Sequence, residues 1–210
     1  MKRALIFGDS YSTFAGCIPE GYEPYYPGLD VETADKTWWH LVAAEAPLTL
    51  VRNDSWSGST ICYTGYNGVD RSRSSSFIYR LRCLVEEGFF EKNAIDTVLV
   101  FGGTNDSWTG GPLGEPLLEG AEEKDLYAVL PAIGHFFAAL RQAAPRAAVY
   151  CLINTDLKPE ITTTLEVAAR HNGAIPVVFS HIDKQNGHPT AAGMRQIADR
   201  VLQVMDQQTE

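Results

Sequence analysis

The chain has 210 residues and a mass of 23.1 kDa, with 45% hydrophobic and 20% charged residues, which is typical of one globular domain. Its formal net charge of −9 argues against nucleic-acid binding and against binding to an anionic membrane surface. No apolar run approaches the length of a membrane span, and the apolar stretch near the N-terminus is too short for a signal peptide. We therefore expect a single cytoplasmic domain over residues 1–210, with its four cysteines reduced.

Five short apolar runs predict β-strands. They cover residues 4–7, 48–51, 97–101, 147–153 and 175–179. Apolar runs without alternation are typical of strands that are buried on both faces, as in a parallel sheet. The segments between and after these runs predict helices over residues 36–46, 74–87, 124–144, 159–171 and 189–205. This alternation predicts a three-layer α/β/α sandwich with right-handed crossovers.

Two connections are longer than simple turns. They cover residues 11–35 and 107–123, and each follows the end of a predicted strand. Long irregular loops in a compact domain are usually binding loops or lids. Open α/β sheets bind their ligands at the carboxyl ends of the strands, so we expect both loops to border a functional crevice.

Polar residues follow the predicted strands at the same edge of the sheet. Ser10 follows the first strand, Gly58 the second and Asn105 the third, and His188 precedes the last helix. These are the residue types that acyl transfer requires. A serine becomes nucleophilic when a nearby histidine accepts its proton. Backbone N–H groups and a side-chain amide can stabilise the resulting oxyanion.

The sequence resembles the SGNH, or GDSL-like, hydrolase superfamily in four blocks: Gly8-Asp9-Ser10, Gly58, Gly103-Thr104-Asn105-Asp106 and His188-Pro189. The resemblance implies a five-stranded parallel sheet of flavodoxin-like order 2-1-3-4-5. It also implies ester hydrolysis without a metal or another cofactor. Ser10 would then be the nucleophile and His188 the base. Ser10, Gly58 and Asn105 would supply the oxyanion hole.

One position departs from the family pattern, which usually places an aspartate three residues before the histidine. That position is Gln185 here, and the nearest carboxylate is Asp183, five residues before His188. We expect Asp183 to orient the imidazole as the third member of a triad. The alternative is a Ser–His dyad in which a backbone carbonyl or Gln185 holds the histidine.

Five aromatic residues lie in segments that we expect at the catalytic edge: Tyr22, Tyr25, Tyr26, Trp56 and Trp108. A rim of Tyr and Trp suits a sugar ring or a small acyl pocket better than a long lipid tail. We therefore predict an esterase that acts on small-molecule substrates with short acyl groups, including O-acetyl groups on a carbohydrate. The alternative is a non-catalytic module that binds a saccharide or peptide on the same fold. His181 is a rival base that lacks the block context, and the nucleophile elbow of the α/β-hydrolases is absent.

Overall fold

The computed structural model describes residues 1–66 and 73–208 and contains a five-stranded parallel sheet. The sheet order is β2-β1-β3-β4-β5, which confirms the predicted flavodoxin-like arrangement. The strands are β1 (Lys2–Gly8), β2 (Leu48–Ser55), β3 (Thr97–Phe101), β4 (Ala148–Ile153) and β5 (Ile175–Val178). Because β1 lies between β2 and β3, the loops that follow these three strands meet at one edge of the sheet.

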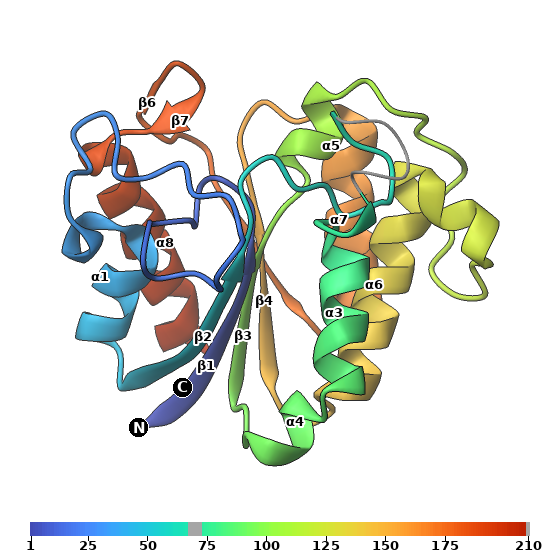
Figure 1. Cartoon of the computed structure of the whole chain (residues 1–210), viewed down its shortest axis with the longest axis horizontal. Helices are drawn as coiled ribbons and strands as arrows, with labels where there is room; N and C mark the ends of the chain where they lie inside the picture. Colours follow the sequence, from blue (N-terminus) through green and yellow to red (C-terminus); the bar gives the residue numbers. More distant parts are fainter. Residues whose placement is uncertain (67–72, 209–210) are drawn as a thin grey trace.

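Helices cover both faces of the sheet (Figure 1). One face carries α1 (Trp38–Glu45) and α8 (Ala191–Gln207). The other face carries α3 (Phe77–Glu86), α6 (Val129–Ala143) and α7 (Pro159–His171). Shorter helical segments complete the described part: η1 (Ala34–Lys36), α4 (Phe89–Lys92), α5 (Thr104–Trp108) and η2 (Glu123–Tyr127). The predicted three-layer α/β/α sandwich is confirmed.

The central strand β1 shows why the strands read as continuous apolar runs. Leu5 and Phe7 pack into the core under α3 and α6, whereas Ala4 and Ile6 pack into the core under α1 and α8. Successive side chains of a strand point to opposite faces, and both faces of this sheet are covered. Neither face of β1 is exposed to solvent from Ala4 onward, so these residues do not alternate between apolar and polar.

Several element boundaries differ from the prediction by a few residues, and two of these differences have a clear physical cause. β2 continues four residues beyond its apolar run, because the polar residues 53–55 are buried and pair with the end of β1. The helix predicted over residues 124–144 is divided into η2 and α6. Pro131 lies in the first turn of α6, where a missing backbone N–H costs nothing. A helix that continued from residue 124 would place this proline in its interior, so α6 begins separately at Val129.

A small antiparallel hairpin precedes the last helix. It joins β6 (Lys184–Gln185) to β7 (His188–Pro189), and its turn consists of Asn186 and Gly187 with φ angles of 51° and 79°. An Asn-Gly pair with two positive φ angles is typical of a two-residue type I′ hairpin. The prediction that the last helix starts at residue 189 is wrong, because Pro189 belongs to β7 and Thr190 caps α8. Within residues 1–66 and 73–208, no helix combines the length and apolarity that a membrane crossing requires.

Candidate functional site

The end of β1 sets the position of Ser10. Gly8 is packed so tightly that a Cβ atom there would lie 2.4 Å from the Oγ of Ser55 and 2.5 Å from the Cβ of Ser12. A residue without a side chain therefore lets the chain turn immediately after the strand. This turn brings Ser10 to the edge of the sheet, where only 3% of its surface is exposed.

Ser10 and His188 meet at the carboxyl-end edge of the sheet, as the sequence predicts. The Oγ of Ser10 lies 3.0 Å from the Nε2 of His188, although 178 residues separate them in the chain. The Nδ1 of His188 lies 3.3 Å from the backbone carbonyl oxygen of Asn186. Burial lowers the pKa of His188 from its ordinary value, and the Asn186 carbonyl opposes this effect. A neutral imidazole with its proton on Nδ1 can accept a proton at Nε2.

Asp183 does not take the position expected for an orienting carboxylate. Its Oδ2 accepts a hydrogen bond from the Thr190 hydroxyl, and its backbone carbonyl accepts one from Thr190 N at 3.1 Å. The carboxylate is thus engaged at the start of α8, while the following hairpin carries His188 toward Ser10. Gln185 is exposed and pairs with His188 only through the hairpin backbone. The expected contact between Asp183 and the imidazole is therefore corrected to a contact with Asn186.

Hydrogen bonds hold the loops after β2 and β3 close to the end of β1. Trp56 N donates to the carbonyl of Gly8 at 3.1 Å, two residues before Gly58. The Nδ2 of Asn105 donates to the carbonyl of Ser59 at 2.9 Å, one residue after Gly58. Asn105 is 3% exposed at the start of α5. The structure thus brings together the three segments that carry the predicted oxyanion donors.

The five predicted aromatic residues fall into three groups. Tyr25 stacks on the imidazole of His188 with ring centroids 3.6 Å apart and an interplanar angle of 7°, and Trp108 approaches the same ring at 6.0 Å and 75°. Tyr22 stacks on Trp56 with centroids 4.3 Å apart. Tyr26 is fully buried. The expectation that Tyr26 lines the rim is therefore wrong.

The profile of the GDSL-like lipase/acylhydrolase family matches residues 2–205. The chain belongs to this family. A protein assigned as a GDSL-like lipase from Bacteroides uniformis ATCC 8492 shares 39% identity and a TM-score of 0.89, over 98% of this chain and 96% of that one. A second protein assigned as a GDSL-like lipase, from Bacteroides ovatus ATCC 8483, shares 35% identity with this chain and a TM-score of 0.90, over 99% of both chains. Membership of the GDSL-like family supports a hydrolase that acts on esters.

A more distant structure shares only the fold with this GDSL-like protein. It is a family two carbohydrate esterase from Clostridium thermocellum in complex with cellohexaose, with 16% identity and a TM-score of 0.68. The match covers 99% of this chain and 64% of that one. No significant match to a curated protein was found.

Sequence reasoning missed a buried arginine beneath the GDSL-like site. The guanidinium of Arg80 donates to the Asp54 carboxylate at 3.0 Å, to the Gly8 carbonyl at 3.2 Å and to the Ser59 hydroxyl at 3.3 Å. Burial lowers the pKa of Arg80, and the charge of Asp54 opposes this. The arginine joins the segment before Ser10 to the segment after Gly58. Its position three residues after Phe77 places it on the apolar face of α3, which was the available signal.

Two further carboxyl groups lie beneath the site of this GDSL-like protein. Burial is the main cause that raises the pKa of Asp9 to about 7 and the pKa of Asp106 to about 6. Asp106 accepts hydrogen bonds from the backbone N–H groups of Ile61 and Cys62. The Asp106 carboxyl therefore fixes the loop that follows Gly58. The Oδ1 of Asp9 accepts one from Tyr11 N at 3.0 Å.

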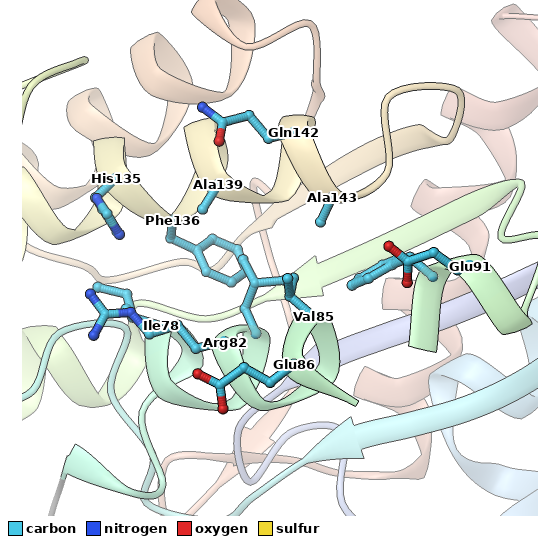
Figure 2. Close-up of a pocket in the computed structure, with 12 residues that line it drawn as sticks. Ile78, Arg82, Val85, Glu86, Glu91, His135, Phe136, Ala139, Gln142 and Ala143 are labelled. Atoms are coloured by element: carbon cyan, nitrogen blue, oxygen red, sulfur yellow. The ribbon is translucent and has the colours of Figure 1, made fainter. Parts of the chain in front are cut away.

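A separate cavity of about 410 Å³ lies between α3, α4 and α6 (Figure 2). Its lining includes Arg82, Glu86 and His135, and contains none of the predicted site residues. Burial is the main cause that lowers the pKa of His135. In the described parts of the chain, no cluster of three or more His, Cys, Asp or Glu side chains has the geometry to hold a metal ion.

Proposed function

We propose that the protein is a serine esterase that cleaves short acyl esters through a Ser10–His188 dyad. The observation that carries the proposal is the 3.0 Å separation between the Ser10 Oγ and the His188 Nε2. This distance lies within the range of a hydrogen bond between a nucleophile and its general base. The family match supplies independent support for chemistry on esters.

In the proposed mechanism, His188 moves one proton in each half of the reaction. Ser10 Oγ attacks the ester carbonyl while its proton passes to Nε2 of His188, which forms a tetrahedral intermediate and an imidazolium. The bond to the leaving alcohol then breaks, and Nε2 gives the proton to the alcohol oxygen. Water attacks the acyl-enzyme in the second half with the same proton transfers. The products are the carboxylic acid and the free enzyme.

The oxyanion hole is proposed to consist of the backbone N–H groups of Ser10 and Gly58 and the side-chain amide of Asn105. A primary amide has two N–H donors, and one N–H of Asn105 is already bound to Ser59. That bond fixes the amide plane, and the second N–H remains to donate to the oxyanion. Donors that are fixed before the reaction stabilise the developing charge most effectively.

The Asn186 carbonyl is proposed to replace the usual triad carboxylate. A carbonyl that accepts from Nδ1–H selects the tautomer that leaves Nε2 free for the Ser10 proton. It carries only a partial charge, so it stabilises the imidazolium less than a carboxylate would. The engagement of Asp183 with Thr190 supports this assignment over the triad.

The aromatic residues support a small substrate. The stacked pair of Tyr22 and Trp56 and the 45% exposed Trp108 offer flat apolar faces that suit a sugar ring or a short acyl group. We therefore propose acetyl and propionyl esters, including O-acetylated carbohydrates, as the substrate class. Tyr26 takes no part in this surface.

A direct test is hydrolysis of p-nitrophenyl acetate with and without a serine-reactive phosphonate. We expect turnover that the phosphonate abolishes, with the label on Ser10 by peptide mass spectrometry. Ser10→Ala should be folded, inactive and unlabelled, and Ser57→Ala serves as a matched control in a neighbouring loop that retains the label. A folded wild-type protein that neither hydrolyses esters nor reacts with the phosphonate would favour the non-catalytic binding module.

A further inference from the structure

The orientation of His188 has an unusual basis for a serine hydrolase. Its Nδ1 faces a neutral carbonyl at 3.3 Å, slightly beyond the usual range of an N–H···O hydrogen bond. The other ring nitrogen, Nε2, contacts the Ser10 Oγ at 3.0 Å. Both contacts are made at the edge of the ring, so a group that packs on the ring face can add to the restraint that keeps Nε2 directed toward Ser10.

Tyr25 makes that contact. Its ring lies parallel to the imidazole within 7°, with the two centroids 3.6 Å apart. A face-to-face arrangement is unfavourable for two neutral rings, which prefer offset or edge-to-face contacts. It becomes favourable when one ring is a cation, because the negative face of the phenol ring attracts positive charge.

The backbone around Tyr25 is fixed to both halves of the dyad. Tyr25 N donates to the Thr13 hydroxyl at 2.8 Å, and that hydroxyl donates to the Ser10 carbonyl at 3.1 Å. The hydroxyl of the next residue, Tyr26, donates to the carbonyl of Pro189 at 2.6 Å, one residue after His188. The pair of adjacent tyrosines therefore spans the nucleophile segment and the base segment.

We propose that Tyr25 is a positioning residue that holds the His188 ring and stabilises its imidazolium through the face of the phenol, in the role that a carboxylate has in a triad. The inference rests on the proposed esterase function. The role of Tyr25 explains how the protein could hydrolyse esters although Gln185 stands at the usual carboxylate position and Asp183 is bound to Thr190. Tyr25 does not exchange protons with the substrate.

The surroundings of His188 leave Tyr25 as the main source of such stabilisation. Tyr11 and Trp108 approach the imidazole at larger centroid distances, 5.6 and 6.0 Å, and at interplanar angles of 49° and 75°, so neither ring stacks on it face to face. Lys184, on the same hairpin, directs its ammonium to the Thr155 hydroxyl at 2.6 Å. Asn186 contributes a neutral carbonyl.

The experiment compares Tyr25→Leu, which removes the π face, with Tyr25→Phe, which keeps it. For Tyr25→Leu we expect kcat on p-nitrophenyl acetate to fall by roughly five- to thirtyfold, the range of a partly desolvated cation–π contact. KM should change little, and the pKa of His188 should fall, both in the pH profile of kcat/KM and by NMR titration of its ring. Tyr25→Phe should retain the wild-type pKa and most of kcat. Tyr22→Leu is the matched control for the pKa measurement. Tyr22 lies in the same loop, but its ring stacks on Trp56 rather than on the imidazole, so its removal should leave the pKa of His188 unchanged.

Fluorinated phenylalanines at position 25 provide a second test that preserves the shape of the ring. Increasing fluorination weakens the negative face, so the pKa of His188 and kcat should fall in step. A pKa that is unchanged across this series, or raised in Tyr25→Leu, would overturn the proposal and leave Tyr25 only a packing role. Failure of the esterase function itself would be distinct, since wild-type protein would then lack hydrolysis while the NMR titration still reports on Tyr25 and His188.

Discussion

The carboxylate of Asp183 accepts a hydrogen bond from the hydroxyl of Thr190, the residue that caps the N-terminus of α8. The same hydroxyl accepts from Gly193 N at 3.2 Å, so the three residues form one network at the start of the helix. A negative charge at this end of a helix also interacts favourably with the helix dipole. Asp183 therefore anchors the base of the hairpin whose second strand, β7, carries His188.

Asp183→Asn should consequently affect stability more than catalysis. We expect kcat to fall by less than about tenfold, whereas loss of a true triad carboxylate costs up to about 10⁴. The free energy of unfolding should fall by about 0.5–2 kcal/mol, the usual cost of a weakened helix cap. Urea denaturation and p-nitrophenyl acetate kinetics measure the two effects, and Thr190→Val should reproduce the stability loss. If Asp183→Asn is folded but its kcat is lower by roughly a thousandfold or more, Asp183 is the third member of a triad and the dyad assignment is wrong.

Asn105→Ala should lower kcat by about 10²–10³ with little change in KM, because an oxyanion donor acts mainly in the transition state. The substitution also removes the bond to Ser59, so circular dichroism and thermal unfolding should accompany the kinetics. Asn93→Ala removes a comparable side-chain bond, to the Phe89 carbonyl after α4 and outside the candidate site, and serves as the control. A change confined to KM would identify Asn105 as a substrate contact.

Much of the candidate site was predictable because the ends of parallel strands are constrained geometrically. A parallel sheet places every carboxyl end at one edge, so Ser10 and Asn105 could be located from apolar runs and the residues that follow them. Which group contacts the Nδ1 of His188 was not predictable in the same way, and a backbone carbonyl was only one of the alternatives. The contact is made by the Asn186 carbonyl, whose direction depends on the φ angles of the turn at Asn186 and Gly187 rather than on any side chain. The Asn-Gly pair was a signal for the hairpin, but not for the contact.

The two adjacent tyrosines show a second limit. Tyr25 is half-buried against His188, whereas Tyr26 is fully buried and bonded to Pro189. Both lie in an irregular loop, where no helical or strand period relates sequence position to direction. Position in the chain could therefore place the pair near the site, but it could not distinguish the residue that contacts the His188 imidazole from the one that supports the loop.

Activity should decline on the acid side with a midpoint below about 6.5, the ordinary pKa of histidine. Burial disfavours the charged form of His188 and lowers its pKa, so the imidazole stays neutral, and able to accept the Ser10 proton, to a lower pH. The measurement is kcat/KM for p-nitrophenyl acetate between about pH 4.5 and 8.5, corrected for uncatalysed hydrolysis. A midpoint at or above about 7 would mean that stabilisation of the imidazolium, by a nearby negative charge or by the Tyr25 ring, outweighs burial.

Arg80→Met should lower the free energy of unfolding by about 3–5 kcal/mol, the usual cost of removing one partner of a buried ion pair. Within residues 1–66 and 73–208, the change leaves the buried Asp54 carboxylate with the Nε of Arg52, at 2.8 Å, as its one remaining ionic partner. Arg82→Met is a matched control two residues along α3. Arg82 pairs with Glu123 at an exposed site, and its loss should cost no more than about 1 kcal/mol. Equal losses in both variants would show that the buried network contributes little.

The carboxyl of Asp9 should make the protein less stable as the pH rises from about 4 to about 7. Burial, with a smaller contribution from the charge of Asp106, raises the pKa of Asp9 to about 7 in the folded state, whereas an unfolded aspartate has a pKa of about 3.9. Between these values the folded state retains a proton that the unfolded state releases, so the free energy of unfolding falls with increasing pH and becomes constant above the folded pKa.

Asp9→Asn cannot ionise and should remove this dependence. Relative to wild type, the variant should gain stability between about pH 4 and 7, by an amount on the order of a few kcal/mol at pH 8. Some dependence of stability on pH should persist in the variant, because the pKa of Asp106 is raised to about 6, and its ionisation also lowers the free energy of unfolding as the pH rises. Asp156→Asn, at an exposed carboxylate, is the control and should leave the shape of the curve unchanged. Urea unfolding at unit steps from pH 4 to 8 measures all three proteins. Parallel curves for wild type and Asp9→Asn would show that Asp9 is ionised throughout this range.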